Sequence, residues 1–151
     1  MITFAVETLR ECLDELLPIL EAHFEEVNFD KDQVPHEPDW DDYMLLENSR
    51  MLHVVTAREN GTLVGYCSTI INTSLHHRNN VFGVNDALYL IPELRGTRVA
   101  YDMLKFVFAD LKTRGVDHVH LSMKVTHPFD KLCEALGMHL EERLYSLHIG
   151  D

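Results

Sequence analysis

A chain of 151 residues, of which 46% are hydrophobic and 25% charged, has the length and composition of one globular domain spanning residues 1–151. This balance excludes a disordered chain, and no apolar run approaches the roughly 20 residues that a transmembrane helix requires. The net charge of −12 argues against nucleic-acid binding, which needs clustered Lys and Arg to neutralise phosphates. We therefore expect neither a nucleic-acid nor a membrane partner.

The hydrophobic pattern predicts a strand over residues 2–6 and an amphipathic helix over residues 7–27. Pro18 removes a backbone donor from that helix and predicts a kink or break. Asn60-Gly61 lies between two β-rich runs and predicts a hairpin. The other expected elements are a loop over 28–38, a helix over 39–48, strands over 51–58 and 62–72, a loop over 73–80, a strand over 81–91, a helix over 98–114, a strand over 117–125, a helix over 127–136, and strands over 138–143 and 144–149.

This order of elements predicts an α/β domain of mixed α+β type, with one central mixed sheet of about seven strands and helices on both faces. The three cysteines are far apart and lack a CxxC spacing, which argues against a disulfide framework or a zinc site. The N-terminus has no basic region followed by a long apolar core, so we expect no signal peptide and a cytoplasmic location.

The turn over residues 92–97 joins a strand ending at Leu90-Ile91 to the helix that begins near Arg98. Unpaired N–H groups at such a helix start, with the positive end of the helix dipole, bind anions such as pyrophosphate. Gly96 lets the backbone approach closely, and Arg95 and Arg98 add two cations. The alternative is an ordinary strand–turn–helix connection.

The element order, with LYLIPELRGTRVAYDMLKFVFADLKTRGVDHVHLSM in the middle, resembles the GNAT family of acyl-CoA-dependent N-acyltransferases. The likeness is strongest over residues 81–137. The family's pyrophosphate motif, Gln/Arg-x-x-Gly-x-Gly/Ala, falls on Arg95, Gly96, Thr97, Arg98, Val99 and Ala100. Arg98 replaces the inner glycine. It would be strained if that position needs a positive φ, and otherwise its side chain could hold a phosphate.

The resemblance implies acetyl-CoA as co-substrate and no metal. It also places the pantetheine arm beside the backbone of Leu88, Tyr89 and Leu90, where the N–H near Leu90 would polarise the thioester carbonyl. In the family a Tyr on the last helix often protonates the leaving thiolate. That position is Cys133 here, so no general acid is assigned.

The acceptor amine needs a proton acceptor, because an aliphatic amine with a pKa near 10.4 is almost wholly protonated at pH 7. Asp86 is the first candidate and would share a face with Leu88 and Leu90 in a regular strand. The alternative for Asp86 is a bulge or edge residue bonded to backbone donors. His120 is the second candidate base. It alternates with His118 on one strand, a pair that could otherwise be metal ligands.

Acidic residues are concentrated at the start of the chain: residues 1–50 hold fourteen Asp or Glu and three Lys or Arg. In the resembled family this region forms much of the acceptor cleft, and a negative cleft would attract a cationic acceptor. The alternative is that these acids form a solvated helix face. The predicted function is transfer of an acetyl group from acetyl-CoA to a primary amine, of a small molecule or peptide, by direct attack in a ternary complex. The family also implies a homodimer through residues 138–149.

Two other functions fit the sequence. Arg98 in the pyrophosphate motif and the missing Tyr are compatible with a GNAT-fold module that binds CoA or regulates without turnover. The acidic first third is compatible with a decoy protein that binds basic partners.

Overall fold

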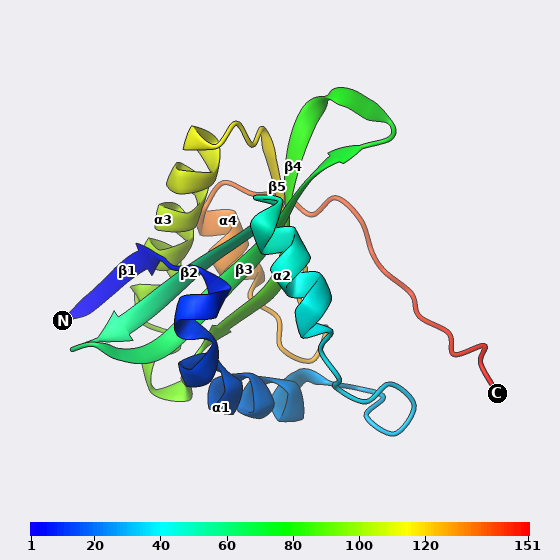
Figure 1. Cartoon of the computed structure of the whole chain (residues 1–151), viewed down its shortest axis with the longest axis horizontal. Coiled ribbons are helices and arrows are strands. Elements are labelled where there is room, and N and C mark those ends of the chain that lie inside the picture. Colours follow the sequence, from blue (N-terminus) through cyan, green and yellow to red (C-terminus); the bar gives the residue numbers. More distant parts are fainter.

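The computed structural model describes all 151 residues. A single five-stranded sheet, in the order β1-β2-β3-β4-β5, runs through the molecule (Figure 1). The first four strands are antiparallel to their neighbours, and β5 is parallel to β4. The elements are β1 (Ile2–Val6), α1 (Leu9–Val27), α2 (Trp40–Asn48), β2 (Leu52–Glu59), β3 (Thr62–Ser74), β4 (His77–Leu90), the 3₁₀ helix η1 (Pro92–Leu94), α3 (Val99–Thr113), β5 (His118–His120) and α4 (Asp130–Ala135).

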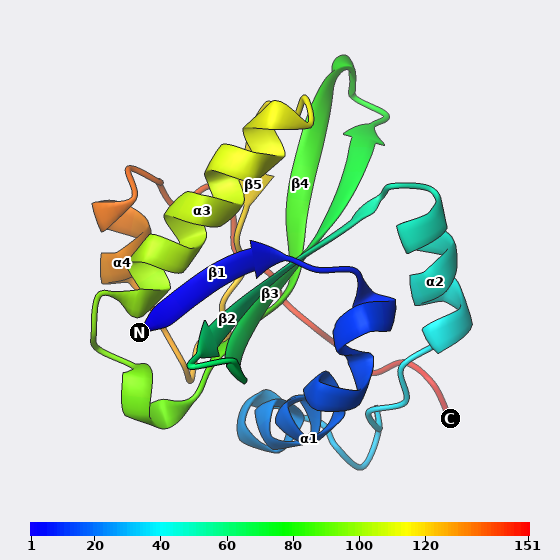
Figure 2. The ribbon, with the colours of Figure 1, turned by 60° about the vertical axis from the view of Figure 1, so that its left-hand side comes forward.

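Helices cover both faces of the sheet, as predicted (Figure 2). On one face, residues of α1 and α2 pack against Tyr66 and Tyr89 of the sheet. On the other, α3 buries Leu104, Val107 and Leu111 against the opposite sides of β2 and β3, with α4 at the edge of that core. None of the helices combines the length and hydrophobicity needed to cross a bilayer.

Helix α1 is held at its start by a reciprocal cap and bends in its middle. The hydroxyl of Thr8 accepts a hydrogen bond from the N–H of Glu11, and the Glu11 carboxylate accepts one from the N–H of Thr8. Pro18 lies inside the helix, which changes direction sharply near its midpoint (Figures 1 and 2). The kink expected at Pro18 is therefore confirmed, and no break accompanies it.

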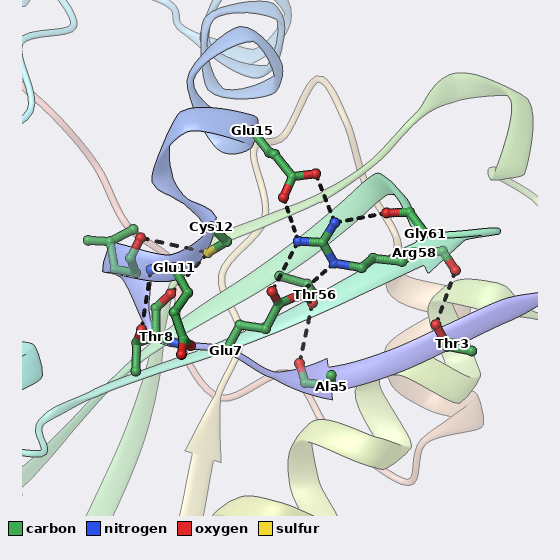
Figure 3. Close-up of polar contacts among 11 residues, drawn as sticks. Thr3, Ala5, Glu7, Thr8, Glu11, Cys12, Glu15, Thr56, Arg58 and Gly61 are labelled. Carbon is green, nitrogen blue, oxygen red and sulfur yellow. Dashed lines mark hydrogen bonds and ion pairs between the residues drawn. The ribbon is translucent and has the colours of Figure 1, made fainter.

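The guanidinium of Arg58 joins β2 to the segment between β1 and α1 and to α1 itself (Figure 3). Two of its bonds go to the Glu7 carboxylate, at 2.9 and 3.0 Å, and two to Glu15, at 2.8 and 2.9 Å. A fifth goes to the carbonyl of Gly61, at 2.9 Å, so every N–H of the guanidinium has an acceptor. Thr56 also donates to Glu7. The bonds from Arg58 hold the pKa of Glu7 below its ordinary value.

Three elements of the structure begin or end at residues other than those predicted from the sequence. The loop expected over 73–80 is instead the tip of a long hairpin, because β3 and β4 stay paired as far as Ser74 and His77. Strand β5 covers only His118–His120, and α4 only Asp130–Ala135.

The two strands predicted over 138–143 and 144–149 are absent, so the expected count of about seven strands is wrong and five are present. The segment after α4 passes close to β5, where a carboxylate oxygen of Glu141 lies 3.3 Å from Nε2 of His120, and then extends away from the sheet as an irregular tail (Figure 1). Its apolar side chains Leu144, Tyr145 and Ile149 are 95%, 89% and 88% exposed. A strand needs a neighbour that pairs with its backbone groups, and no strand of this chain forms backbone hydrogen bonds with the tail.

Removing the Arg58 guanidinium should lower the free energy of unfolding by about 2 kcal/mol, because the partly buried Glu7 carboxylate loses its partner. The change is Arg58→Ala, measured by urea unfolding at pH 7. The control, Lys31→Ala, removes an exposed ion pair to Glu25 and should cost less than about 0.5 kcal/mol. Equal effects of the two substitutions would contradict the account.

The pKa of Glu7 is lower in the folded chain than its ordinary value of 4.5. The stabilisation by its pair with Arg58 is therefore complete above about pH 4.5 and is lost as pH falls through the folded value. The deficit of Arg58→Ala should accordingly shrink in unfolding experiments below pH 4, and a deficit that grows there would oppose this linkage.

Candidate active site

A β-bulge in β4 determines where Asp86 points. In the pairing of β3 with β4, Ser68 is opposite Ala87 and Thr69 is opposite Asn85, so Asp86 is the extra residue. Asp86 and Ala87 therefore both line the pocket beneath α1 and α2, while Leu88 packs into the core on the α3 side. The expectation that Asp86 shares a face with Leu88 and Leu90 is wrong, because it assumed a regular strand. The bulge is the alternative considered above.

Two hydroxyl groups hold the Asp86 carboxylate. Tyr43, on α2, donates to its Oδ2 at 2.8 Å, and Ser68, on β3, donates to the same oxygen at 3.0 Å. The other oxygen, Oδ1, accepts no hydrogen bond from the chain, and Asp86 lines the pocket. Burial and the nearby Asp86 carboxylate raise the pKa of Tyr43, so its hydroxyl stays protonated and remains a donor at neutral pH.

A second polar pair, Tyr66 and His23, lies in the same core. The Tyr66 hydroxyl donates to Nδ1 of His23 at 2.6 Å, and the His23 ring lies 4.9 Å from the ring of Tyr89. Burial lowers the pKa of His23 to about 4, so its ring is neutral at physiological pH and accepts the hydroxyl proton. Sequence reasoning found neither residue, because the two lie on different elements.

The pocket beside Asp86 has a volume of about 410 Å³. Apolar and aromatic side chains from α1, α2 and the sheet make up most of its lining. The lining residues are Leu9, Leu16, Leu20, Phe24, Asn28, Val34, Pro35, His36, Glu37, Pro38, Trp40, Tyr43, Leu52, Val54, Tyr66, Ser68, Asp86, Ala87 and Lys124. Of the acidic residues in 1–50, only Glu37 is among them, which agrees with the alternative that most of these acids lie on a solvated surface. Others form ion pairs elsewhere, such as Glu7 with Arg58 and Glu25 with Lys31.

The edge of β4 facing β5 is open beside the pocket. Strand β5 pairs with β4 only over Phe82–Val84. The Ile91 N–H donates to the Val64 carbonyl of β3 at 2.9 Å, and the alternation of an antiparallel pair then directs the N–H groups of Leu88 and Leu90 away from β3. The backbone of Tyr89, by contrast, is paired with Tyr66 of β3.

The turn into α3 leaves several backbone donors free. Gly96 has φ of +72°, a left-handed conformation that favours glycine. Arg98 has φ of −72°, which does not require a glycine. The strain considered for Arg98 is therefore absent. Thr97 accepts from the Val99 N–H at 3.3 Å, while the N–H groups of Gly96, Arg98 and Ala100 have no acceptor within the chain. The Arg98 side chain is 79% exposed and pairs with Asp102 at 3.0 Å.

Arg95 points toward α1. Its Nε donates to the Leu90 carbonyl at 2.8 Å, and both terminal nitrogens bind the carboxylate of Glu26. The guanidinium carbon lies 5.2 Å from the centre of the Tyr89 ring. Arg95 thus clamps the turn to β4 and to α1, and this pairing lowers the pKa of Glu26.

His120 lies outside the Asp86 pocket. Its ring is 5.3 Å from that of Phe82, and its Nε2 is 3.3 Å from a carboxylate oxygen of Glu141. The ring of His118 also stacks on the ring of Phe82, with 5.3 Å between the two ring centres. Cys133 is on α4, where burial raises the pKa of its thiol. The structure therefore brings Tyr43 and Ser68 to Asp86, and does not bring His120 there.

Residues 13–138 match the model of the acetyltransferase (GNAT) family. The chain belongs to the GNAT acetyltransferase family. The family resemblance and the acetyltransferase assignment predicted from the sequence are thereby confirmed. Comparison with curated protein sequences finds no match.

Solved GNAT structures share the fold over nearly the whole chain. Ribosomal-protein-alanine N-acetyltransferase from Brucella melitensis biovar Abortus 2308 is 20% identical with a TM-score of 0.71, covering 99% of this chain and 100% of that one. Aminoglycoside acetyltransferase HMB0005, from an uncultured soil metagenomic sample, is 16% identical with a TM-score of 0.75, covering 99% of both chains. A predicted acetyltransferase from Clostridium acetobutylicum, solved with acetyl-CoA, is 14% identical with a TM-score of 0.69, covering 99% of this chain and 97% of that one.

The buried neutral ring of His23 should make stability fall in mild acid. Its pKa is about 4 in the folded chain and 6.5 ordinarily, so between these values only the unfolded chain gains the proton. Stability should therefore decrease as pH falls from 6.5 to 4, by at most about 1.4 kcal/mol per pH unit from this group.

The test is His23→Gln, which keeps an acceptor for Tyr66 and removes the titrating ring. Its unfolding free energy should depend less on pH between 6.5 and 4 than that of the unsubstituted chain. His76→Gln, at the exposed hairpin tip, is the control and should leave the slope unchanged. An unchanged slope in His23→Gln would contradict the assignment.

Proposed function

We propose that this GNAT chain transfers an acetyl group from acetyl-CoA to a primary amine by direct attack in a ternary complex. The observation that carries the proposal is the Asp86 carboxylate. Two hydroxyl donors fix it, one of its oxygens is free, and it lies in a pocket beside the open edge of β4. An acceptor amine held there has a proton acceptor within the same pocket.

The residues at the turn and at the β4 edge fit acetyl-CoA. The free N–H groups of Gly96, Arg98 and Ala100 lie at the positive end of α3, where they would hold the pyrophosphate. The exposed Arg98 guanidinium adds a cation at the same end. The open N–H groups of Leu88 and Leu90 would hold the pantetheine arm. Acetyl-CoA supplies an acetyl group activated as a thioester.

In the proposed reaction, one group of this chain accepts the amine proton and another stabilises the negative charge that develops on the thioester oxygen. The Oδ1 oxygen of Asp86 accepts a proton from the ammonium form of the acceptor, which frees the nitrogen lone pair for attack. The nitrogen then bonds to the thioester carbon, the C–S bond breaks, and the second nitrogen proton passes to the CoA thiolate that leaves. The Leu90 N–H donates to the carbonyl oxygen on which negative charge develops. Tyr43 and Ser68 keep the carboxylate oriented while the proton moves. We favour Asp86 over His120 as the base, because His120 does not line the pocket.

We also propose that the tail over residues 138–149 pairs with the edge of β5 in a second copy of the chain. Large apolar side chains on a monomer's tail, among them Leu144 and Ile149, remain in water unless something covers them. Strand β5 is the last strand of the sheet and has an open outer edge. A cytoplasmic location stays a prediction from the sequence.

Asp86→Asn should lower kcat for acetyl transfer by about 100-fold or more, because the amide cannot accept the amine proton. The amide oxygen of the Asn can take the place of the carboxylate oxygen that accepts from Tyr43 and Ser68, so the unfolding temperature and the affinity for acetyl-CoA should change little. The assay follows release of the CoA thiol, with exposed Asp14→Asn as the control. Full activity in Asp86→Asn would remove Asp86 as the base. Acetyl-CoA binding without transfer by the unsubstituted chain would favour the regulatory alternative.

The dimer is tested by light scattering during gel filtration at micromolar concentrations. We expect a particle of twice the 17.5 kDa chain mass, and a monomer when Leu144 and Ile149 are both replaced by Asp. Leu75→Asp, at the exposed tip of the hairpin, is the control and should remain dimeric. A monomeric unsubstituted chain would contradict the proposal.

A further inference from the structure

Most of the residues that line the Asp86 pocket are hydrophobic; besides Tyr43, Tyr66, Ser68 and Asp86, the polar ones are Asn28, His36, Glu37 and Lys124. Helix α1 contributes Leu20 and Phe24, α2 contributes Trp40, and the sheet contributes Val54. The rings of Trp40 and Tyr43 lie 5.6 Å apart and form one aromatic corner of the pocket. Such walls favour a ligand that buries apolar or aromatic surface against them.

The polar groups at the floor of the pocket are already bonded to one another. Tyr43 and Ser68 both donate to one oxygen of Asp86, and Tyr66 donates to His23. Oδ1 of Asp86 accepts no hydrogen bond, and Glu37, from the loop between α1 and α2, is the other carboxylate that lines the pocket. A ligand with many hydroxyl or ammonium groups would leave several of them unpaired against the hydrophobic part of the lining, which costs binding free energy for each group. The Asp86 end of the pocket is therefore matched to a single cationic or amine group.

The volume of the pocket limits the size of the apolar part of the ligand. Its volume of about 410 Å³ lies at the lower end of the range typical of small-molecule sites. An apolar cavity of about 150 Å³ is enough to hold benzene. The pocket can accordingly enclose one or two rings together with a short chain that reaches Asp86.

We propose that the acceptor is an arylalkylamine: a single primary amine joined by a short alkyl chain to an aromatic group. The amine nitrogen lies against Oδ1 of Asp86, and the ring lies against Trp40 and Phe24. This inference rests on the acetyl transfer proposed above and narrows its substrate. It separates this chain from structural neighbours whose acceptors are aminoglycosides, although the fold is shared.

The test compares initial rates of acetyl transfer to phenethylamine, ethylamine, spermidine and kanamycin at saturating acetyl-CoA. We expect kcat/KM for phenethylamine to exceed that for ethylamine by about 100-fold or more, because only phenethylamine fills the apolar walls. Spermidine and kanamycin should be poorer than phenethylamine. Higher kcat/KM for either polycation would overturn the proposed substrate class while leaving acetyl transfer standing.

A binding measurement separates failure of the substrate class from failure of the function. Phenethylamine is titrated calorimetrically into the chain in the presence of CoA, with ethylamine as the comparison. Selective binding of phenethylamine without transfer of acetyl would support the ligand class and overturn the proposed function. Absence of selective binding would overturn the ligand class.

Trp40→Ala tests the role of the aromatic corner. It should lower kcat/KM for phenethylamine about tenfold or more and leave that for ethylamine within about twofold, because the smaller amine does not reach Trp40. Leu45→Ala, on the outward side of the same helix and outside this pocket, should change neither value. An equal loss for both amines in Trp40→Ala would indicate damage to the fold and would overturn Trp40 as a specificity residue.

Discussion

The extra residue in β4 is the feature on which the site depends. In a regular strand Asp86 would face the α3 core, where an unpaired carboxylate is costly to bury. The bulge instead turns it toward α1 and α2, where Tyr43 and Ser68 hold one oxygen and leave the other free. A bulge also disturbs local pairing and increases twist, and it lies where β5 stops pairing with β4.

The chain carries two different chemistries on the two sides of this bulge. On one side, a largely apolar pocket holds the Asp86 carboxylate, which we propose as the base. On the other, the free N–H groups of Leu88 and Leu90 continue toward the open donors at the start of α3. Arg95 connects the pocket side to the row of free donors, because it bonds both to the Leu90 carbonyl and to Glu26 of α1. The role of Arg95 in the fold is thus to hold the turn against the pocket wall.

Local patterns predicted most of the fold. Asn60 and Gly61 both have positive φ, as the hairpin between β2 and β3 requires, and Gly115 ends α3 in the left-handed conformation. Asp86 could also be found from sequence, because a carboxylate inside an apolar strand needs a reason. These features depend on neighbours within a few residues, which is why the sequence alone reveals them.

The remaining features depend on contacts between distant segments. Tyr43 is 43 residues from Asp86, and no spacing rule joins them. The bulge is a property of the register with β3, so side-chain alternation in β4 alone could not show it. The acidic composition of residues 1–50 left a negative cleft and a solvated face both open, because composition does not say which acids form ion pairs and which line a pocket. The tail was predicted as strands from its apolar pattern, but strand formation also needs a partner.

The measurement that tests the account most directly is calorimetric titration of the chain with acetyl-CoA, alongside Gly96→Val. A β-branched side chain opposes the φ of +72° at this position, although space for it is open, so the free donors of the turn should be misplaced. We predict micromolar binding to the unsubstituted chain and a loss of at least about tenfold in affinity in Gly96→Val. No binding to the unsubstituted chain at millimolar acetyl-CoA would contradict the central claim.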